Sequence, residues 1–402
     1  MSITYAVIRV TDRASAQRPV VFAELLFKPV LAWMIDGLKS QGIRQFFLLC
    51  RPEDRERTAG CIPPETDAVI YSGEEELPET LGDAIVLTSP VVLTARELDA
   101  TVKFSQSYGI PAVALVDDDR AALGAYYLNQ TTPEWVLTRL DEGESMSSAL
   151  EQEGLSLAQF QDNGDAILLY DFRRLQETAK VLRRAIVEGH MERGVNFLDP
   201  DSAMIGPEVV IGAGTVILPQ VILRGRVTVG MDCRLGPNTM ITASTIGDGT
   251  EVNASQIVES VVGKKCVIGP FAYLRPGCEI ADRVKVGDFV EVKNSTVGQG
   301  TKLPHLSYIG DADLGAGVNM GCGSITVNYD GKLKHRTTVG DGAFIGCNSN
   351  LVAPVTVGAG AYTAAGSTIT DQVPDGALSI GRARQVNKEG WADKRRAEGK
   401  LK

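Results

Sequence analysis

Large aliphatic residues recur at every sixth position through the second half of the chain, and this repeat limits the fold more than any other feature. A first run comprises Ile205, Ile211, Ile217, Leu223, Val229, Leu235 and Ile241. A second run extends from Val262 to Val292 and a third from Val339 to Ile369. A period of six matches neither an α-helix nor a series of hairpins, but it is typical of a parallel β-helix, in which each hexad forms one short strand and a turn. At three hexads per coil, residues 205–371 predict roughly nine coils.

From Val292 onward, the six-residue rhythm fails in three places. The step shortens to five between Val292 and Val297 and again between Ile309 and Leu314, and His305 lies between these two slips. The rhythm is then lost from residue 321 to residue 338, where GCGSITVNYDGKLKHRTT predicts a projecting loop with Asp330-Gly331 as its turn. Because sites are usually built where loops interrupt a rigid scaffold, we expect the functional site in this region.

The first half of the chain has a different pattern, in which short apolar runs alternate with amphipathic stretches. The runs YAVIRV (5–10), FFLLC (46–50), AIVLT (84–88) and AVALV (112–116) predict buried parallel strands. The stretches VLAWMIDGLKSQG and TARELDATVKFSQSYG predict helices, so the fold class is a Rossmann-like α/β domain followed by the β-helix. We expect residues 1–175 to form the α/β domain, residues 176–194 a charged linker helix, and residues 195–402 the repeat domain with its C-terminal tail.

Charge and cysteine usage exclude several classes of protein. The net charge of −10 argues against a nucleic-acid surface, which needs clustered Lys and Arg to neutralise phosphates. The seven cysteines are scattered without a CxxC pair, which favours reduced thiols over a disulfide framework or a zinc site. The N-terminal stretch lacks the order of segments of a signal peptide, and the most apolar early stretch is interrupted by Glu24 and Lys28. We therefore expect a cytoplasmic protein with neither nucleic acid nor membrane as a partner.

The repeat region contains stretches that are specific to one family. They are IGPFAYLRPG (268–277), VGDFVEVKNSTVG (286–298), HLSYIGDADLGAGVNMGCGSITVNYDGKLKHRT (305–337), NLVAPVTVG (350–358), AAGSTI (364–369) and IGRARQVNKEGW (380–391). Through them, residues 194–390 closely resemble the C-terminal half of the bifunctional N-acetylglucosamine-1-phosphate uridyltransferase/glucosamine-1-phosphate N-acetyltransferase family. The resemblance implies a left-handed parallel β-helix that works as a homotrimer, with acetyl-CoA as co-substrate and no metal in the acetyltransferase site.

The α/β region lacks the loop that a nucleotide site requires. A glycine-rich loop after the first strand lets the backbone approach phosphates, but the first glycine of this chain is Gly37, inside the first predicted helix. FKPVLAWMIDGLKSQGI (27–43) is similar to a motif of the family's uridyltransferase domain, while RVTDRASAQR (9–18) replaces its glycine-rich loop, Pro19-Val20 replaces its Pro-Lys, and Thr88 falls where its metal-binding aspartate is expected. The comparison implies a degenerate nucleotidyltransferase-like domain without uridyl transfer.

His305 is the candidate general base, because imidazole titrates near neutrality and can take the proton of an attacking amine. A lone histidine in an apolar scaffold is more often structural, but the two slips and the match to the family's catalytic histidine favour catalysis. His190, in the linker helix, and His335, in the loop, are expected to be solvated.

The resemblance supplies the remaining site residues. Those implied to bind the sugar phosphate are Arg275, Lys293, Tyr308, Asn319, Lys334 and Glu291. Those implied to bind acetyl-CoA are Cys322, Asn328, Tyr329, Cys347, Ala365 and Arg382, with Arg384 nearby. Cys347 departs from the serine usual in the family. The implied reaction is acetyl transfer from acetyl-CoA to the 2-amine of glucosamine-1-phosphate, in the synthesis of UDP-N-acetylglucosamine and cell-envelope precursors.

Three other functions remain open from the sequence. The chain could acetylate a different amino sugar, or it could be a non-catalytic trimeric scaffold that binds sugar phosphate or CoA. It could also retain uridyl transfer through unconventional residues, which the missing glycine loop disfavours.

Overall fold

The computed structural model describes residues 3–11, 19–73, 75–77, 79, 81–162, 166–169 and 171–402. The chain forms two compact units, Met1–Ala185 and Ile186–Lys402. The boundary falls within helix α6 (Phe172–Glu192), which occupies the stretch expected to link the domains. The domain limits at residues 175 and 195 stay predictions; the first falls inside α6 and the second follows its end.

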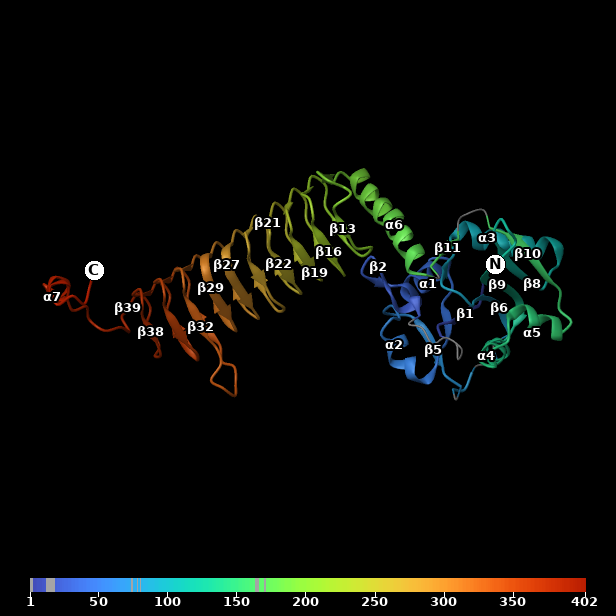
Figure 1. Cartoon of the computed structure of the whole chain (residues 1–402), viewed down its shortest axis with the longest axis horizontal. Helices are drawn as coiled ribbons and strands as arrows, with labels where there is room; N and C mark the ends of the chain where they lie inside the picture. Colours follow the sequence, from blue (N-terminus) through green and yellow to red (C-terminus); the bar gives the residue numbers. More distant parts are fainter. Residues whose placement is uncertain are drawn as a thin grey trace. The chain divides into compact units, whose positions relative to one another are not determined.

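In the described part of the first unit, seven strands form one sheet in the order β10-β8-β9-β6-β1-β4-β5 (Figure 1). They are β1 (Tyr5–Arg9), β4 (Gln45–Leu49), β5 (Asp67–Tyr71), β6 (Gly82–Leu87), β8 (Ala112–Val116), β9 (Ala122–Thr131) and β10 (Leu157–Gln161). The four predicted strands correspond to β1, β4, β6 and β8. β1 runs parallel to β4 and β6, whereas β9, which the sequence analysis did not predict, is antiparallel to β6 and β8.

The helices of this unit are α1 (Val30–Lys39), α2 (Arg55–Ala59), α3 (Ala95–Tyr108), α4 (Pro133–Asp141) and α5 (Met146–Gln152). Short strands pair elsewhere, namely β2 (Glu24–Leu25) with β3 (Lys28–Pro29) and β7 (Val91–Val92) with β11 (Ile167–Leu168). α3 begins where the Thr94 side chain accepts a hydrogen bond from the backbone N–H of Glu97, and it ends at Gly109 in the left-handed conformation. The α/β prediction is confirmed.

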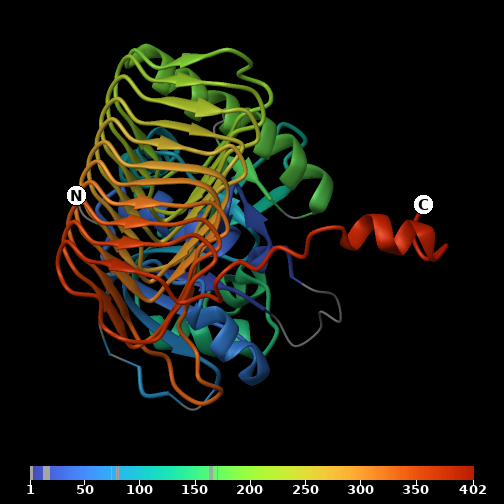
Figure 2. The ribbon, with the colours of Figure 1, turned by 90° about the vertical axis from the view of Figure 1, so that its left-hand side faces the viewer.

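The second unit is a parallel β-helix, and all of residues 186–402 are described. Nine strands form one sheet, β14 (Val210–Ile211), β17 (Thr228–Val229), β20 (Thr245–Ile246), β23 (Val261–Val262), β26 (Glu279–Ile280), β28 (Thr296–Val297), β30 (Ala312–Leu314), β33 (Thr337–Val339) and β36 (Val355–Val357). Nine strands on one face agree with the number of coils that the repeat predicts. Figure 2 shows the coils stacked on one another, with α7 (Trp391–Ala397) apart from the last coil.

The other strands of the second unit form a nineteen-stranded sheet within these described residues. Its members are β12 (Asn196–Phe197), β13 (Met204–Ile205), β15 (Val216–Ile217), β16 (Ile222–Arg224), β18 (Arg234–Gly236), β19 (Met240–Thr242), β21 (Glu251–Asn253), β22 (Gln256–Val258), β24 (Val267–Ile268), β25 (Tyr273–Leu274), β27 (Lys285–Lys293), β29 (Lys302–Gly310), β31 (Asn319–Met320), β32 (Ile325–Val327), β34 (Phe344–Ile345), β35 (Asn350–Val352), β37 (Tyr362–Thr363), β38 (Thr368–Ile369) and β39 (Leu378–Ser379).

The hexad aliphatics fill the interior of this β-helix. Every residue of the first run is at most 4 % exposed, and Thr363, which takes the one missing aliphatic place in the third run, is buried too. Stacking of these side chains from coil to coil removes their apolar surface from water and stabilises the repeat. The predicted fold class, an α/β domain followed by a parallel β-helix of hexapeptide repeats, is therefore confirmed.

Coil length changes at the places where the sequence rhythm fails. Val210 pairs with Thr228, eighteen residues on, which is three hexads. Asp288 pairs with His305 after only seventeen residues, and Asp313 pairs with Thr338 after twenty-five. The longer coil contains the predicted loop, which projects beside β32 in Figure 1. No helix in the described part of the chain is long and apolar enough to cross a membrane.

Candidate functional site

His305 lies at a corner of its coil, where the chain turns between two faces of the β-helix. The following residue, Leu306, has a φ of 37°, in the left-handed region. Parallel pairing of β29 with β27 places His305 directly beside Asp288 of the preceding coil. The Nδ1 atom of His305 lies 2.7 Å from Oδ1 of Asp288, and the His305 side chain is 56 % exposed. The corner therefore presents this imidazole to solvent and fixes its orientation through one carboxylate.

The Asp288 contact determines which nitrogen of the ring is basic. An ionised carboxylate can only accept hydrogen bonds, so Nδ1 of His305 carries the proton and donates it. The hydrogen bond from His305 lowers the pKa of the Asp288 carboxyl below its usual range, so Asp288 is ionised at neutral pH. In the neutral ring, Nε2 then has the free lone pair, which is the arrangement that a general base requires.

Asp288 was not among the residues predicted from the sequence. The signal was present, because Asp288 lies in VGDFVEVKNSTVG, seventeen residues before His305, which is the length of one shortened coil. Residues one coil apart are neighbours in a parallel β-helix. Counting back one coil from His305 would have identified its partner.

Three of the residues expected to bind acetyl-CoA lie at the same corner in the coils that follow His305. Backbone hydrogen bonds connect Gly323 N to Leu306 O, Asn348 N to Cys322 O and Gly366 N to Cys347 O, each at 2.8 Å. His305, Cys322, Cys347 and Ala365 therefore occupy equivalent positions in four successive coils, and we call this set the corner column. Arg382 lies near its end, with Cδ 3.7 Å from the position that a Cβ atom on Gly366 would take.

Two of the residues expected to bind the sugar form an ion pair on the strand face after the corner. Nη1 of Arg275 lies 2.8 Å from Oε1 of Glu291, and each side chain is 38 % exposed. The hydrogen bond that Arg275 donates to Glu291 raises the pKa of Arg275 further, so its charge is constant. β27 and β29 pair in a register that places Glu291 beside Tyr308. Arg275, Glu291 and Tyr308 are thus brought together.

Two lysines expected to bind the phosphate lie side by side. The neighbouring Lys293 lowers the pKa of Lys334, because two ammonium groups in close contact oppose each other's charge. Asp311 lies buried next to them. Burial would raise the pKa of Asp311, but hydrogen bonds from Asn294 and Asn328 and the charges of both lysines lower it instead. An added dianion would relieve the repulsion between the two lysines, so the pair is suited to a phosphate.

The structure separates some residues that the resemblance grouped together. Asn328, expected to bind acetyl-CoA, is buried, and its Nδ2 lies 3.4 Å from the hydroxyl of Tyr308 on the sugar side. Tyr329 is exposed in the projecting loop and donates to the carbonyl of Gly331 at 2.7 Å. Asn319 lies on β31, on the strand segment before the corner, in register with Lys302. Within one chain, Asn319 is therefore on a different face from Tyr308.

The other two histidines differ from each other. His190 is only 3 % exposed, so the expectation that it is solvated was wrong. Its position in a charged helix concealed the fact that the end of α6 packs into the β-helix core, as does the neighbouring Val187. His335 is half-buried in the loop, where Nε2 lies 2.8 Å from Oδ2 of Asp330.

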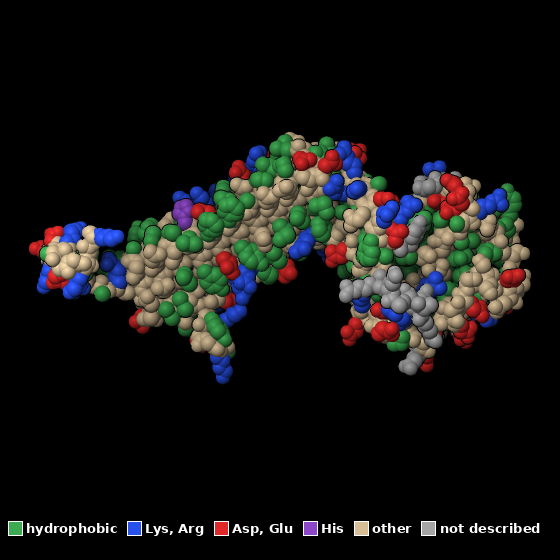
Figure 3. All heavy atoms as spheres, in the orientation of Figure 1, with side chains coloured by type: hydrophobic (Ala, Val, Ile, Leu, Met, Phe, Trp, Pro, Cys, Tyr) green, Lys and Arg blue, Asp and Glu red, His purple; other side chains and the backbone are tan. Residues whose placement is uncertain are grey.

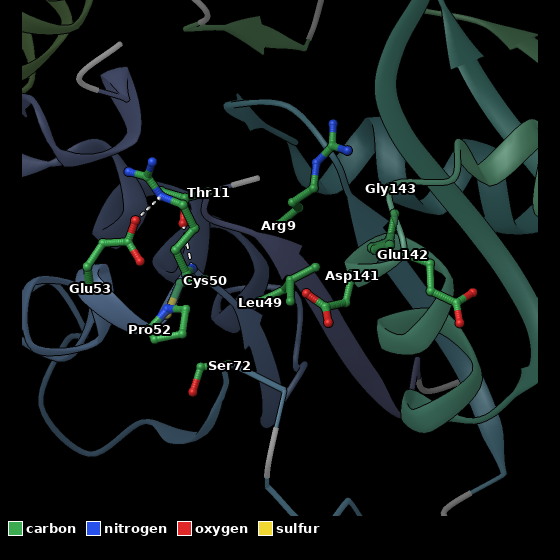
Figure 4. Close-up of a pocket in the computed structure, with 12 residues that line it drawn as sticks. Arg9, Thr11, Leu49, Cys50, Pro52, Glu53, Ser72, Asp141, Glu142 and Gly143 are labelled. Carbon is green, nitrogen blue, oxygen red and sulfur yellow. Dashed lines mark hydrogen bonds and ion pairs between the residues drawn. The ribbon is translucent and has the colours of Figure 1, made fainter. Parts of the chain in front are cut away.

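A cleft of about 500 Å³ lies at the carboxyl ends of β1, β4 and β5, where open α/β sheets usually bind ligands (Figure 4). It is lined by Arg9, Thr11, Leu49, Cys50, Arg51, Pro52, Glu53, Ser72, Leu140, Asp141, Glu142 and Gly143. Arg9 donates to the backbone carbonyl of Thr88 at 3.0 Å. Thr88, at the place of the family's metal-binding aspartate, offers no carboxylate. Of the stretch that replaces the glycine-rich loop, residues 12–18 lie outside the described residues.

The exposed His–Asp pair and the adjacent cations lie on the coiled repeat, and the same repeat is matched by a known family model. The family model "Bacterial transferase hexapeptide (six repeats)" matches residues 208–243, 259–294 and 336–371. These three segments thus contain the hexapeptide repeat that the family model describes.

The relatives found by sequence are more specific. The bifunctional protein GlmU of Brevibacillus brevis is 53 % identical over 239 residues, which are 60 % of this chain and 52 % of the relative. GlmU of Caldanaerobacter subterraneus is 58 % identical over 57 % of this chain and 50 % of its own length, and GlmU of Geobacillus sp. (strain WCH70) is 50 % identical over 68 % and 57 %. The predicted resemblance to the bifunctional family is confirmed, and the chain spans about half the length of these curated relatives.

Among solved structures, 4-diphosphocytidyl-2C-methyl-D-erythritolsynthase from Anaerococcus prevotii aligns with 45 % of this chain and 98 % of its own. The TM-score is 0.33 and the sequence identity 10 %. A similarity this weak supports no conclusion about the first unit.

Proposed function

We propose that this protein transfers the acetyl group of acetyl-CoA to the 2-amine of glucosamine-1-phosphate, giving N-acetylglucosamine-1-phosphate and CoA. The observation that carries the proposal is the Asp288–His305 pair at the head of the corner column. It supplies an oriented base beside residues implied to bind acetyl-CoA on one side and a cationic sugar-phosphate site on the other. The product would feed the synthesis of UDP-N-acetylglucosamine in the cytoplasm.

The chemistry follows from the orientation of the imidazole. Nε2 of His305 takes the proton from the amine as its nitrogen attacks the thioester carbonyl. The resulting tetrahedral intermediate collapses with cleavage of the carbon–sulfur bond, and the proton held by His305 passes to the leaving thiolate. Asp288 stabilises the imidazolium between these two steps. The acetyl group goes directly to the amine, without an acyl-enzyme.

The cations around Tyr308 give the acceptor its orientation. Lys293 and Lys334 hold the phosphate, and Arg275 with Glu291 contacts the hydroxyls of the ring. The protein as a whole is acidic, with a net charge of −10, so an anionic substrate needs such a local concentration of positive charge. Arg382, near the end of the corner column, provides a positive charge for the phosphates of CoA.

A second and a third copy of the chain would complete the site. Asn319 and Tyr308 lie on different faces of one β-helix, so a single sugar cannot contact both within one chain. Large hydrophobic side chains are also exposed along the coils (Figure 3), among them Val261, Val267, Phe271, Phe289, Leu306, Phe344 and Tyr362. Patches of this kind mark protein interfaces. A homotrimer would cover them and bring Asn319 of one copy to the site of the next.

The proposal is tested by following the release of CoA thiol from acetyl-CoA and glucosamine-1-phosphate by the purified protein. In parallel, UTP and N-acetylglucosamine-1-phosphate are tested for release of pyrophosphate. We expect thiol release without pyrophosphate. Turnover only with a different amino sugar would correct the acceptor, pyrophosphate release would restore the second activity, and binding of acetyl-CoA without any turnover would replace the enzyme with a scaffold.

A further inference from the structure

The seven cysteines differ in exposure. Cys50, Cys233, Cys266 and Cys278 are buried, and burial raises the pKa of each thiol. Burial also raises the pKa of Cys61, which is half-buried. Cys322 is half-buried and Cys347 is exposed, and both belong to the corner column. Reaction with an external reagent requires an accessible thiol, and Cys347 is the exposed one, with the half-buried Cys322 in the same column.

Cys322 and Cys347 are direct neighbours across two coils. β31 pairs with β34, and β32 pairs with β35, in registers that both place residue 322 opposite residue 347. The backbone N–H of Asn348 donates to the carbonyl of Cys322 at 2.8 Å, which fixes this register at the corner itself. Adjacent parallel strands lie about 4.8 Å apart, which is inside the range of roughly 4.4–6.8 Å between the Cα atoms of a disulfide.

The glycines that precede the two cysteines show how closely the coils are packed here. A Cβ atom on Gly321 would lie 2.5 Å from the backbone nitrogen of Cys347, and one on Gly346 would lie 2.6 Å from that of Ala365. Real Cβ atoms do not approach backbone so closely, so glycine is required at both positions. The coils are therefore packed tightly at this corner, and the two cysteines are held as a pair in which both side chains leave the same edge.

We propose that Cys322 and Cys347 form a dithiol that reacts with the disulfide form of CoA and closes a disulfide across the corner column, which stops acetyl transfer reversibly. This inference rests on the proposed function, because the corner column is where that function places the thioester of acetyl-CoA. A ligand that brings a sulfur atom to this column meets two thiols, of which Cys347 is the more exposed.

The reaction balances in two exchanges. The thiolate of Cys347 attacks one sulfur of CoA disulfide, forming a mixed disulfide and releasing one CoA thiolate. The thiolate of Cys322 then attacks the Cys347 sulfur, forming the protein disulfide and releasing the second CoA thiolate. The two cysteines are oxidised, CoA disulfide is reduced to two CoA thiols, and the two protons that leave the cysteine thiols protonate the two CoA thiolates. A disulfide between Cys322 and Cys347 would lie at this partly exposed corner. Exposed disulfides are easily reduced, which is typical of regulatory disulfides.

The test is incubation of the full-length reduced protein with CoA disulfide, or with oxidised glutathione at the same concentration, followed by mass spectrometry under non-reducing conditions. We expect a transient adduct of one CoA, and then a protein lighter by two hydrogen atoms whose peptides are joined through Cys322 and Cys347. CoA disulfide should react about tenfold faster than oxidised glutathione, because the column binds CoA. Acetyl transfer should fall about tenfold on oxidation and return with dithiothreitol.

Variants assign the sulfur atoms. Cys347→Ser should prevent the crosslink, and Cys322→Ala should leave the CoA adduct trapped on Cys347. Cys61→Ser, which removes a half-buried thiol of the first unit, should behave as the parent does. The proposal would be overturned if Cys347 reacted without forming the crosslink to Cys322. It would also be overturned if CoA disulfide labelled Cys61 to the same extent as Cys347. Mass spectrometry detects the disulfide without any turnover. A protein that closes the disulfide but has no acetyltransferase activity would therefore refute the proposed function alone. Equal rates with CoA disulfide and oxidised glutathione would refute the recognition of CoA.

Discussion

The cleft of the α/β unit and the site around the corner column of the β-helix both contain charged side chains, but these are held in different ways. In the cleft, the charged groups pair locally, as Arg51 does with Asp54 at 2.7 Å. In the β-helix, functional groups come from separate coils, and the repeat itself places them, as it places Asp288 beside His305. A site assembled by register persists as long as the repeat does, whereas a site that depends on one glycine-rich loop is lost with that loop.

The largest effect expected from this comparison is the loss of the base. His305→Ala should lower kcat for acetyl transfer by about 10²- to 10⁴-fold, the usual contribution of a general base. The exposed position of His305 predicts that the variant folds normally, which circular dichroism and gel filtration would check. Arg9→Ala, made in the α/β cleft, should leave acetyl transfer unchanged. A fully active His305→Ala protein would remove the base from the mechanism.

The second prediction concerns the paired lysines. Lys293→Ala should raise KM for glucosamine-1-phosphate by about 10- to 100-fold, because one of two charges on the phosphate is lost, while kcat changes little. Lys264→Ala is the matched control, since Lys264 is an exposed lysine of the same β-helix that pairs with Asp248 at 2.9 Å. Steady-state kinetics with the sugar as the varied substrate separates the two parameters. An equal effect of both substitutions would mean that the lysines act only through overall charge.

A smaller effect is expected from the positioning residue. Asp288→Asn should lower kcat by about tenfold or more with KM for both substrates unchanged, because the amide no longer selects the ring tautomer or stabilises the imidazolium. Asp371→Asn, which changes an exposed carboxylate outside the site, should have no effect. If Asp288 were merely structural, the substitution would lower thermal stability and leave kcat of the folded protein intact.

The extent to which the sequence predicted these features depends on how local each determinant is. The hexad repeat was sufficient for the β-helix, because each coil repeats one local rule. His305 was identifiable because two slips flank it, while Asp288 required the coil length. β9 was missed because ALGAYYLNQT mixes apolar and polar residues within a short stretch, and its antiparallel pairing with β6 and β8 is a tertiary property. The burial of His190 is another tertiary property, which its charged neighbours in sequence conceal.

The last prediction concerns the effect of that buried histidine on stability, with no effect expected on acetyl transfer. Burial, and then the charge of Arg193, lowers the pKa of His190 from 6.5 to about 4, and Nη2 of Arg193 donates to its Nδ1 at 3.1 Å. Because the folded pKa lies below the unfolded one, the unfolded chain takes up the proton first as the pH falls. The contribution of neutral His190 is therefore complete above pH 6.5 and decreases by about 1.4 kcal/mol for each pH unit down to pH 4.

Replacing the titrating group should remove this dependence. His190→Leu should show a smaller fall in the Tm of the β-helix unit between pH 6.5 and 4.5 than the parent protein, as followed by circular dichroism. His335→Gln, which removes a histidine from the projecting loop, should keep the slope of the parent. The same slope in all three proteins would show that His190 is protonated in the folded state, and that the end of α6 admits water. The result also bears on the comparison between regions of the molecule. It tells whether water is excluded from the first coil as well as from the coils that hold the corner column.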